Sequence, residues 1–251
     1  MISAIVVSHG HHAELAESLP ALAPQVDEIV LVANVFGSLP HDTHGARVVQ
    51  NAGPLSYAAN LNRAIAETTG ELVLVNNPDA VPEPGAVVVL AEFMNEHARC
   101  GIAGPRLVNP DGSWQASRRR FPTIGGTLVR RTPLRRVFPP LERQRAHYEL
   151  DERPEEPVEA DWMLGGSLLL RRAMLDQLGG YDAGFRMYGE EIDLCYRAAK
   201  AGWERWYVPR AVVRHRWDAL TDQTFWTRRT IWHWRSIIRF VRKHPERLFA
   251  R

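Results

Sequence analysis

A chain of 251 residues with 45% hydrophobic and 24% charged side chains is large enough for one large or two small globular domains with a buried core. Its formal net charge of +2 excludes a general nucleic-acid-binding role, and two cysteines without a zinc-type spacing predict free thiols in a reducing cytoplasm. No stretch reaches the ~18 apolar residues of a membrane span, so we expect a cytoplasmic protein that is soluble or peripheral.

The first half of the sequence predicts strands that alternate with helices. Continuous apolar, β-branched runs are typical of strands buried in a parallel sheet, and they occur at 3–8, 27–34, 46–53 and 71–77. Helical patterns occur at 11–25, 55–70 and 84–97. This alternation predicts an α/β fold with ligands at the carboxyl ends of the strands, where Ser8, His9, Asn34 and the segment 76–79 fall.

Two common nucleotide-binding motifs do not occur in the sequence. The segment after the first strand, "SHGHHAEL", does not contain G-x-G-x-x-G, and G-x-x-x-x-G-K-[ST] is absent from the whole chain. We therefore expect neither a dehydrogenase-type dinucleotide domain nor a P-loop enzyme.

The second half is organised differently. Residues 100–123 predict a hairpin-like strand–turn–strand unit around "NPDG", and a Gly-Gly turn at 165–166 precedes another strand and helix. A helix over 190–202, ended by Gly202, and a strand region over 205–217 follow. The acidic segment 148–161 predicts a surface linker. Arginines without an acidic neighbour, suited either to solvent or to a diphosphate, are Arg118, Arg119, Arg120, Arg130, Arg131, Arg135 and Arg136.

Several local patterns occur together in a fixed order. They are "SAIVVSHG", "NAGPLSYAANLNRAI", "GELVLVNNPDAVPEPGAV", "GIAGPRLVNPDGSWQASRRRFPT", "DWMLGGSLLLRRAML", "GGYDAGFRMYGEEIDLCYRAAKAGW" and "YVPRAVVRH". In these segments the chain resembles the family 2 inverting glycosyltransferases with the GT-A fold, most closely their rhamnosyltransferase-like members. The resemblance implies a GT-A domain over 1–217, with a nucleotide-sugar-binding half (1–104) and an acceptor and catalytic half (105–217), followed by an extension over 218–251.

The segment "NNPDA" ends a strand with the single carboxylate of Asp79. By itself such a segment is typical of a turn. The resemblance implies that Asp79 binds Mg²⁺ or Mn²⁺ on the donor diphosphate, because these cations take oxygen ligands from carboxylates, phosphates and water. It also implies that His215 reaches the metal or the diphosphate, with a structural histidine as the alternative. Many relatives have two carboxylates in the first motif, where this chain keeps one.

A second acidic motif, "GEEIDL", begins a helix. Acids in the first turn of a helix complement its dipole, which is the alternative to a catalytic role. The resemblance implies that Glu191 is the base that deprotonates the acceptor hydroxyl. The family usually has Asp at this position, so the longer side chain of Glu191 changes the geometry. Glu190 is expected on the acceptor side, and Asp193 is expected to cap or orient the helix.

The resemblance also implies which residues surround the substrates. Gly165 and Gly166, after Trp162, are expected to form the acceptor-side floor, since glycine permits close backbone approach. The family's second strand ends in an aspartate that binds the nucleobase or ribose, whereas this chain has Ala33. Donor binding is therefore assigned to Ser8, His9, Asn34, Gly53, Tyr57, Asn60, Asn77 and Asp79, with Asn62 on the same helix.

The C-terminal segment predicts an amphipathic helix. Apolar residues recur at helical spacing at Ile231, Trp234, Ile237, Ile238 and Val241, and basic residues flank them at Arg228, Arg235, Arg239 and Arg242, with Trp226 and Trp232 adding amphipathic rings. Such a helix either packs on the core or lies on anionic lipid at the inner face of the cell membrane. Both arrangements are compatible if one edge of the helix packs on the core and the other edge faces the lipid.

The sequence thus predicts a metal-dependent inverting glycosyltransferase. Its donor is expected to be a dTDP- or UDP-sugar, with rhamnose as the sugar suggested by the resemblance, and its acceptor a glycan or lipid-linked glycan. A non-catalytic sugar-nucleotide or glycan-binding protein is the alternative that Ala33 and Glu191 leave open. A glycoside hydrolase with paired carboxylates is a third reading, but it has no use for diphosphate recognition.

Overall fold

The computed structural model describes residues 1–122, 152–216 and 228–248. Its strands are β1 (Ile2–Ser8), β2 (Glu28–Ala33), β3 (Arg47–Gln50), β4 (Leu72–Asn76), β5 (Ala80–Pro82), β6 (Cys100–Val108), β7 (Arg118–Arg119), β8 (Val158–Glu159), β9 (Trp162–Met163), β10 (Ser167–Arg171) and β11 (Glu204–His215). Its helices are α1 (His12–Leu22), η1 (Ala23–Gln25), α2 (Tyr57–Ala66), α3 (Ala86–Glu96), α6 (Arg172–Leu178), α7 (Glu190–Lys200), α9 (Arg228–Lys243) and η3 (Pro245–Leu248).

The core is one mixed, mostly parallel sheet. Within the described residues its order is β3-β2-β1-β4-β10-β6-β11-β5, and β8 pairs with β11. β1 is parallel to β2 and β4, as the alternating sequence pattern predicted, whereas β10 lies antiparallel between β4 and β6. This arrangement confirms the predicted α/β, GT-A-like fold. Strands from before and after residue 104, the expected boundary between the two halves of the domain, belong to this one sheet.

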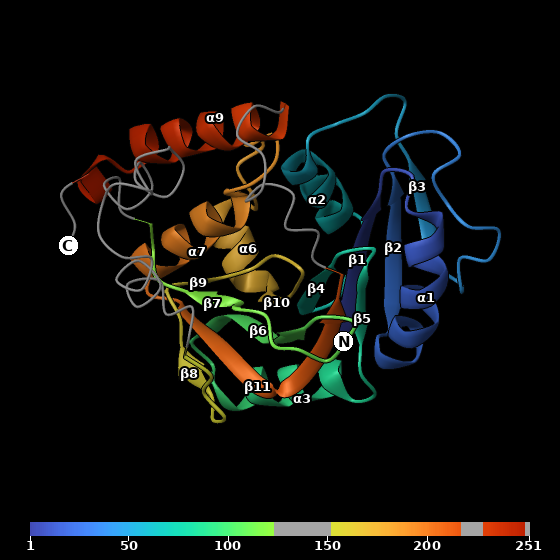
Figure 1. Ribbon diagram of the computed structural model, residues 1–251, viewed down its shortest axis with the longest axis horizontal. Coiled ribbons are helices and arrows are strands. Elements are labelled where there is room, and N and C mark those ends of the chain that lie inside the picture. Colours follow the sequence, from blue (N-terminus) through green and yellow to red (C-terminus); the bar gives the residue numbers. More distant parts are fainter. Residues whose placement is uncertain (123–151, 217–227, 249–251) are drawn as a thin grey trace.

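Helices cover both faces of the sheet (Figure 1). One apolar cluster includes side chains of α2, α6 and α7, among them Leu61, Met174 and Leu194. The other includes side chains of α1 and α3, among them Leu19 and Leu90. Because the central strands contact helices on each side, their sequences are continuously apolar rather than alternating.

Three details differ from the sequence-based expectation. The segment after the "NPDG" turn does not form the expected hairpin with β6, and only one bridge, between Val108 and Trp114, joins the two. Further along this segment, β7 pairs with β9 instead. The helix expected to end at Gly70 ends at Ala66, and Gly70 instead approaches the first strand so closely that a Cβ there would lie 2.5 Å from Ser3 Oγ. The short strand β5 was not predicted.

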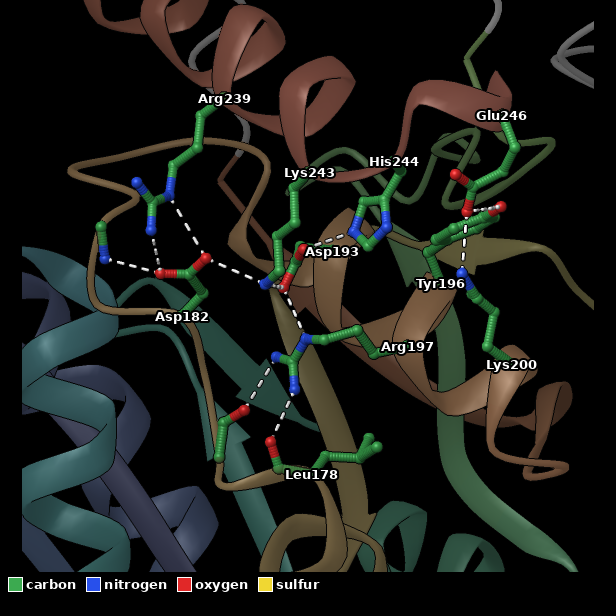
Figure 2. A network of polar contacts seen from close by, with 12 residues as sticks. Leu178, Asp182, Asp193, Tyr196, Arg197, Lys200, Arg239, Lys243, His244 and Glu246 are labelled. Carbon is green, nitrogen blue, oxygen red and sulfur yellow. Dashed lines mark hydrogen bonds and ion pairs between the residues drawn. The ribbon is translucent and has the colours of Figure 1, made fainter. Parts of the chain in front are cut away.

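Helix α9 packs on α7 through ion pairs and hydrogen bonds (Figure 2), and also through an edge-on contact between the Phe240 and Tyr196 rings. Lys243 Nζ lies 2.9 Å from carboxylate oxygens of both Asp182 and Asp193. Arg239 also pairs with Asp182, at 2.7 Å, and His244 Nε2 lies 2.8 Å from Asp193 Oδ1. Asp193 has no exposed side-chain surface, so its role is to fasten two helices together in addition to its i,i+4 pair with Arg197.

The predicted apolar stripe of α9 is divided between two faces. Among the α9 residues whose burial the structure describes, Ser236 and Phe240 are buried, and His244 just beyond the helix is buried as well. Ile231 and Ile238 are 55% and 48% exposed. The helix therefore docks with one edge and presents apolar side chains on the other. Among the residues that the structure describes, no helix is both long enough and apolar enough to cross a bilayer.

Asp193→Ala should destabilise the protein by about 3 kcal/mol, because it leaves cationic partners around a fully buried position without their counter-ion. Urea unfolding followed by circular dichroism measures the change. The matched control is Glu67→Ala, which removes an exposed ion pair with Arg47 and should leave the midpoint nearly unchanged. Equal effects of the two substitutions would contradict the fastening role of Asp193.

Candidate functional site

The turn after β4 is built by its two asparagines. Asn76 Nδ2 donates to the backbone oxygens of Asn77 and Ala80, at 3.0 and 2.8 Å. The Asn77 backbone N–H donates to Gly166 O at 2.9 Å, and its side-chain oxygen accepts from the Tyr57 hydroxyl at 2.9 Å. These bonds hold Asp79 at the carboxyl edge of the sheet, with 27% of its side chain exposed.

His215, at the end of β11, lies beside Asp79. Its Nε2 is 3.7 Å from Asp79 Oδ1 and 3.5 Å from Asn77 Nδ2. Gly166 supports the ring from below, since a Cβ there would lie 3.1 Å from Nε2. Burial lowers the pKa of His215, and the charge of Asp79 offsets part of that effect. The imidazole is therefore neutral at pH 7 and retains one nitrogen lone pair.

These residues fit a divalent cation that is shared with a diphosphate. Asp79 and His215 offer one carboxylate and one imidazole nitrogen at a partly open edge. Within the described parts of the chain, no group of three or more His, Cys, Asp or Glu side chains forms a metal cage. Two protein ligands suit Mg²⁺ or Mn²⁺, because such sites commonly complete their coordination with substrate phosphates and water.

The first turn of α7 presents the second acidic motif. Gly189 precedes the helix with φ 89°, and its N–H donates to Glu191 Oε2 at 3.2 Å. Glu190 is 6% exposed, and its Oε2 has no hydrogen-bond partner among the described residues. Burial raises the pKa of both carboxyl groups, and the charge of Glu191 raises that of Glu190 further. Glu191 is half-buried beside Glu190, and because two adjacent carboxylates repel each other, ionisation of one disfavours ionisation of the other.

Tyr57 shows that the two acidic motifs face one space. Burial raises the pKa of its hydroxyl far above the usual value, and the charges of Glu190, Glu191 and Asp79 raise it further. Tyr57 also donates to Asn77, which couples the first turn of α2 to the turn after β4. The sequence motifs at Asp79, Glu191 and His215 therefore converge at one edge of the sheet.

The residues expected on the acceptor side separate into two groups. Gly165 faces the base candidate, since a Cβ there would make ordinary contact with Glu191 Cβ at 3.8 Å. Trp162 is only 6% exposed, and its indole N–H donates to Arg120 O at 2.8 Å. Arg119 lies over the Trp162 ring, and its charge offsets part of the rise that burial causes in the pKa of Glu191. Trp162 thus supports the floor rather than lining it.

The residues expected to bind the donor form a polar network at the ends of β1, β2 and β3. Asn34 Oδ1 accepts from Asn51 Nδ2 at 2.9 Å, and Asn51 Nδ2 also lies 2.6 Å from Asn60 Oδ1. His9 is exposed, with Nδ1 3.1 Å from Asn34 Nδ2. Ser8 is buried and donates to Ser38 O. The network orders the loops around the exposed Gly53.

Sequence reasoning missed two polar residues near the site, Asn51 and Gln115, and the structure shows the partner of a third, Asn62. Asn51 also accepts from Arg63 at 2.6 Å, and its place just after β3 was a usable signal. Gln115 contacts both the ring and the backbone of His215, which no local pattern indicated. Asn62 exchanges two hydrogen bonds with the backbone of Tyr181, so it orders that loop. Arg130, Arg131, Arg135 and Arg136 lie outside the described residues.

Comparison with known proteins gives consistent matches. The family model described as glycosyltransferase like family 2 matches residues 23–233. An N-acetylglucosaminyl-diphospho-decaprenol L-rhamnosyltransferase of Mycobacterium tuberculosis is 33% identical, over 85% of this chain and 75% of its own length. The low-salt glycan biosynthesis hexosyltransferase Agl10 of Haloferax volcanii is 26% identical over 79% of this chain and 62% of its own length.

Solved structures share the fold at low sequence identity. GalNAc-T7 with UDP, GalNAc and Mn²⁺ superposes with a TM-score of 0.64 at 14% identity, covering 96% of this chain. The mannosyltransferase PcManGT from Pyrobaculum calidifontis, in complex with GDP-Man and Mn²⁺, gives a TM-score of 0.56 at 15% identity and covers 85% of this chain. This chain spans 47% and 56% of the lengths of those two chains.

Glu190→Gln should raise the melting temperature at pH 7, because it removes an unpartnered buried carboxyl group whose pKa is raised in the folded state. Because the pKa of Glu190 is raised in the folded state, the native protein holds this proton more strongly than the unfolded chain, whose value is near 4.5. The stabilisation from the bound proton is complete below the unfolded value and is lost as pH rises through the folded pKa. The gain should therefore grow with pH and vanish near pH 4.

The melting temperature measured by calorimetry between pH 4 and 8 tests this expectation. Glu92→Gln, at an exposed position of α3, is the matched control and should leave the pH profile unchanged. A Glu190→Gln profile parallel to that of the wild type would show that Glu190 is not protonated preferentially in the folded protein.

Proposed function

The chain belongs to glycosyltransferase family 2, and on that premise we propose that it transfers rhamnose, with inversion, from a dTDP- or UDP-sugar to a hydroxyl group of a lipid-linked glycan. The observation that carries this proposal is the convergence of Asp79 and His215 with Glu191 around Tyr57. The sugar and the type of acceptor are carried over from the relative that is named as a rhamnosyltransferase acting on N-acetylglucosaminyl-diphospho-decaprenol.

In the proposed reaction Glu191 removes the proton of the acceptor hydroxyl. The oxygen then attacks the anomeric carbon from the side opposite the diphosphate, so that the bond to the nucleoside diphosphate breaks and the configuration inverts. Glu191 suits this role because a base whose pKa lies closer to the working pH accepts a proton more effectively. Gly165 leaves room for the acceptor beside the Glu191 stem.

The leaving diphosphate would lie at the edge where Asp79 and His215 meet. A divalent cation held there, Mg²⁺ or Mn²⁺, would neutralise the negative charge that develops on the diphosphate. Asn77 and Gly166 position the two ligands, one from the β4 turn and the other from beneath the imidazole ring. Ser8 and Asn34 order the loops of the donor side, and the exposed His9 lies at their rim.

Ala33 is the main departure from the family pattern, since no carboxylate is available there for the nucleobase or ribose. Its backbone oxygen accepts from Asn51 N–H and from Gln50 Nε2, at 3.0 and 3.1 Å. The end of β2 is thus used to hold the loop after β3. We propose that loop backbone groups and His9 contact the nucleoside in place of the missing aspartate.

A donor panel tests the proposed function. UDP-, dTDP- and GDP-sugars are incubated with the protein, a polyprenyl-diphosphate N-acetylglucosamine acceptor, and Mn²⁺, Mg²⁺ or EDTA, and nucleotide release is measured. We expect release with a dTDP- or UDP-rhamnose donor that EDTA and Asp79→Asn abolish, and a rate loss of about 10²- to 10⁴-fold for Glu191→Gln. Glu92→Gln, at an exposed position of α3, should retain full activity.

The other outcomes of this assay are also decisive. Release that persists in EDTA and in Asp79→Asn would exclude the metal role of Asp79. Metal-dependent thermal stabilisation by a sugar nucleotide, without release from any donor, would identify a non-catalytic binding protein instead.

We also propose that the outer face of α9 rests on the anionic inner face of the cell membrane. The exposed Ile231 and Ile238 lie on the side of α9 that does not contact α7, and exposed Arg235 and Arg242 lie on the same helix. Apolar side chains flanked by arginines suit the boundary between lipid headgroups and acyl chains. This placement would keep a lipid-linked acceptor close to α7.

Co-sedimentation with vesicles that contain anionic lipid tests the membrane proposal. The wild type should bind at low salt and dissociate as the ionic strength rises, whereas Ile231→Ser combined with Ile238→Ser should bind several-fold more weakly. Val88→Ser, at a position of α3 that is 46% exposed, is the matched control and should bind like the wild type. Failure of the wild type to sediment at low salt would exclude this role.

A further inference from the structure

The "NPDG" turn after β6 carries a chain of hydrogen bonds that ends on His215. Gln115, which follows this turn, is 2% exposed and contacts His215 twice. Its Nε2 donates to the His215 backbone oxygen at 2.6 Å, and its Oε1 lies 3.1 Å from His215 Nδ1. The segment of this turn therefore contacts His215, which is a candidate metal ligand.

The contacts at His215 determine which way the Gln115 amide faces. A backbone carbonyl oxygen accepts hydrogen bonds and never donates, so the group 2.6 Å from it must be the NH₂ of Gln115. The amide oxygen then faces His215 Nδ1. Because that oxygen also only accepts, Nδ1 must carry the hydrogen.

The opposite end of the chain of bonds gives the same orientation independently. Ser113 Oγ donates its only proton to Asp111 Oδ1 at 2.6 Å, since the carboxylate accepts only. Hydrogen bonds from Ser113 lower the pKa of Asp111, which keeps it ionised at neutral pH. The Ser113 oxygen must therefore accept from Asn109 Nδ2 at 2.8 Å.

The orientation of the Asn109 amide determines that of the Gln115 amide. With its NH₂ on Ser113, Asn109 directs its Oδ1 at Gln115 Nε2, at 2.7 Å. Both hydrogens of the Gln115 amide are then used, one by Asn109 and one by the His215 backbone. A flipped amide would place two acceptors against each other at both contacts.

We propose that Gln115 is a positioning residue that holds His215 in its Nδ1–H tautomer and so keeps the lone pair on Nε2, toward Asp79. A histidine that binds a metal commonly donates its other ring N–H to such a partner, which fixes the ring and the tautomer. His215 is 7% exposed, so water is a poor substitute for the amide. The use of this lone pair for a metal rests on the proposed function, whereas the tautomer does not.

The tautomer is measured directly in the metal-free protein. Nitrogen-15 NMR of histidine-labelled protein distinguishes protonated from unprotonated ring nitrogens, and a His215→Gln sample assigns the signal among the 10 histidines. We expect the Nδ1–H form to predominate in the wild type. A predominant Nε2–H form would overturn the proposal without any variant.

Gln115→Leu removes the acceptor at Nδ1 while nearly keeping the side-chain volume. It should shift the tautomer toward Nε2–H and weaken Mn²⁺ binding about 10- to 100-fold, measured by calorimetry with UDP present. Glu92→Gln, at an exposed position of α3 outside this chain of hydrogen bonds, is the control and should leave tautomer and affinity unchanged.

The outcomes separate this inference from the proposed function. An unchanged tautomer or an unchanged Mn²⁺ affinity in Gln115→Leu would overturn the positioning role and indicate only a structural turn. A wild-type Nδ1–H tautomer without any Mn²⁺ binding would instead contradict the metal role in the proposed function, and the hydrogen-bond chain would stand.

Discussion

The site depends on the antiparallel insertion of β10 between β4 and β6. This pairing places Ser167 opposite Asn76, so the two glycines before β10 arrive at the carboxyl end of β4. Gly166 then accepts from the Asn77 backbone and leaves space for the His215 ring. A side chain at Gly166 would press on that ring, which is why the close approach of three segments requires glycine there.

Charge is distributed unequally across α7. Glu190 is buried and Glu191 is half-buried, with few compensating hydrogen bonds, and their pKa values rise. Asp193, three residues after Glu190, is instead surrounded by the basic side chains of Arg197, Lys243 and His244 (Figure 2). The helix that carries the acidic pair is thus anchored by a nearby compensated carboxylate, which helps to keep Glu191 in place relative to the sheet.

The same contrast applies to the polar residues around the edge of the sheet. Ser8, Asn34 and the NH₂ group of Asn76 are largely used by the protein itself to order turns and loops. Asp79 retains partial exposure, and Glu190 Oε2 and Asn76 Oδ1 have no hydrogen-bond partner among the described residues. Polar groups that the fold does not satisfy are the ones available to a ligand, because an unsatisfied buried group has a free-energy cost that a substrate can offset.

How far the sequence predicted this protein depends on the range of the interactions. Apolar runs and helical spacing are local, so they predicted β1, β2, β4 and α7 nearly to their ends, and Gly202 after α7 has the left-handed φ of 84° expected of a helix terminator. Family motifs identified Asp79, Glu191 and His215 as candidates. Neither source indicated β5, the pairing of β7 with β9, or the contact of Gln115 with His215.

By itself the sequence determined the fold class and the types of side chain at the site, because strand periodicity, glycine positions and acidic motifs can be recognised in short segments of the chain. Only the tertiary structure decided which edge of α9 is buried and which polar side chains remain available. Those outcomes depend on contacts between residues far apart in the chain, such as Lys243 with Asp193 or His215 with Gln115, and no local pattern encodes such contacts.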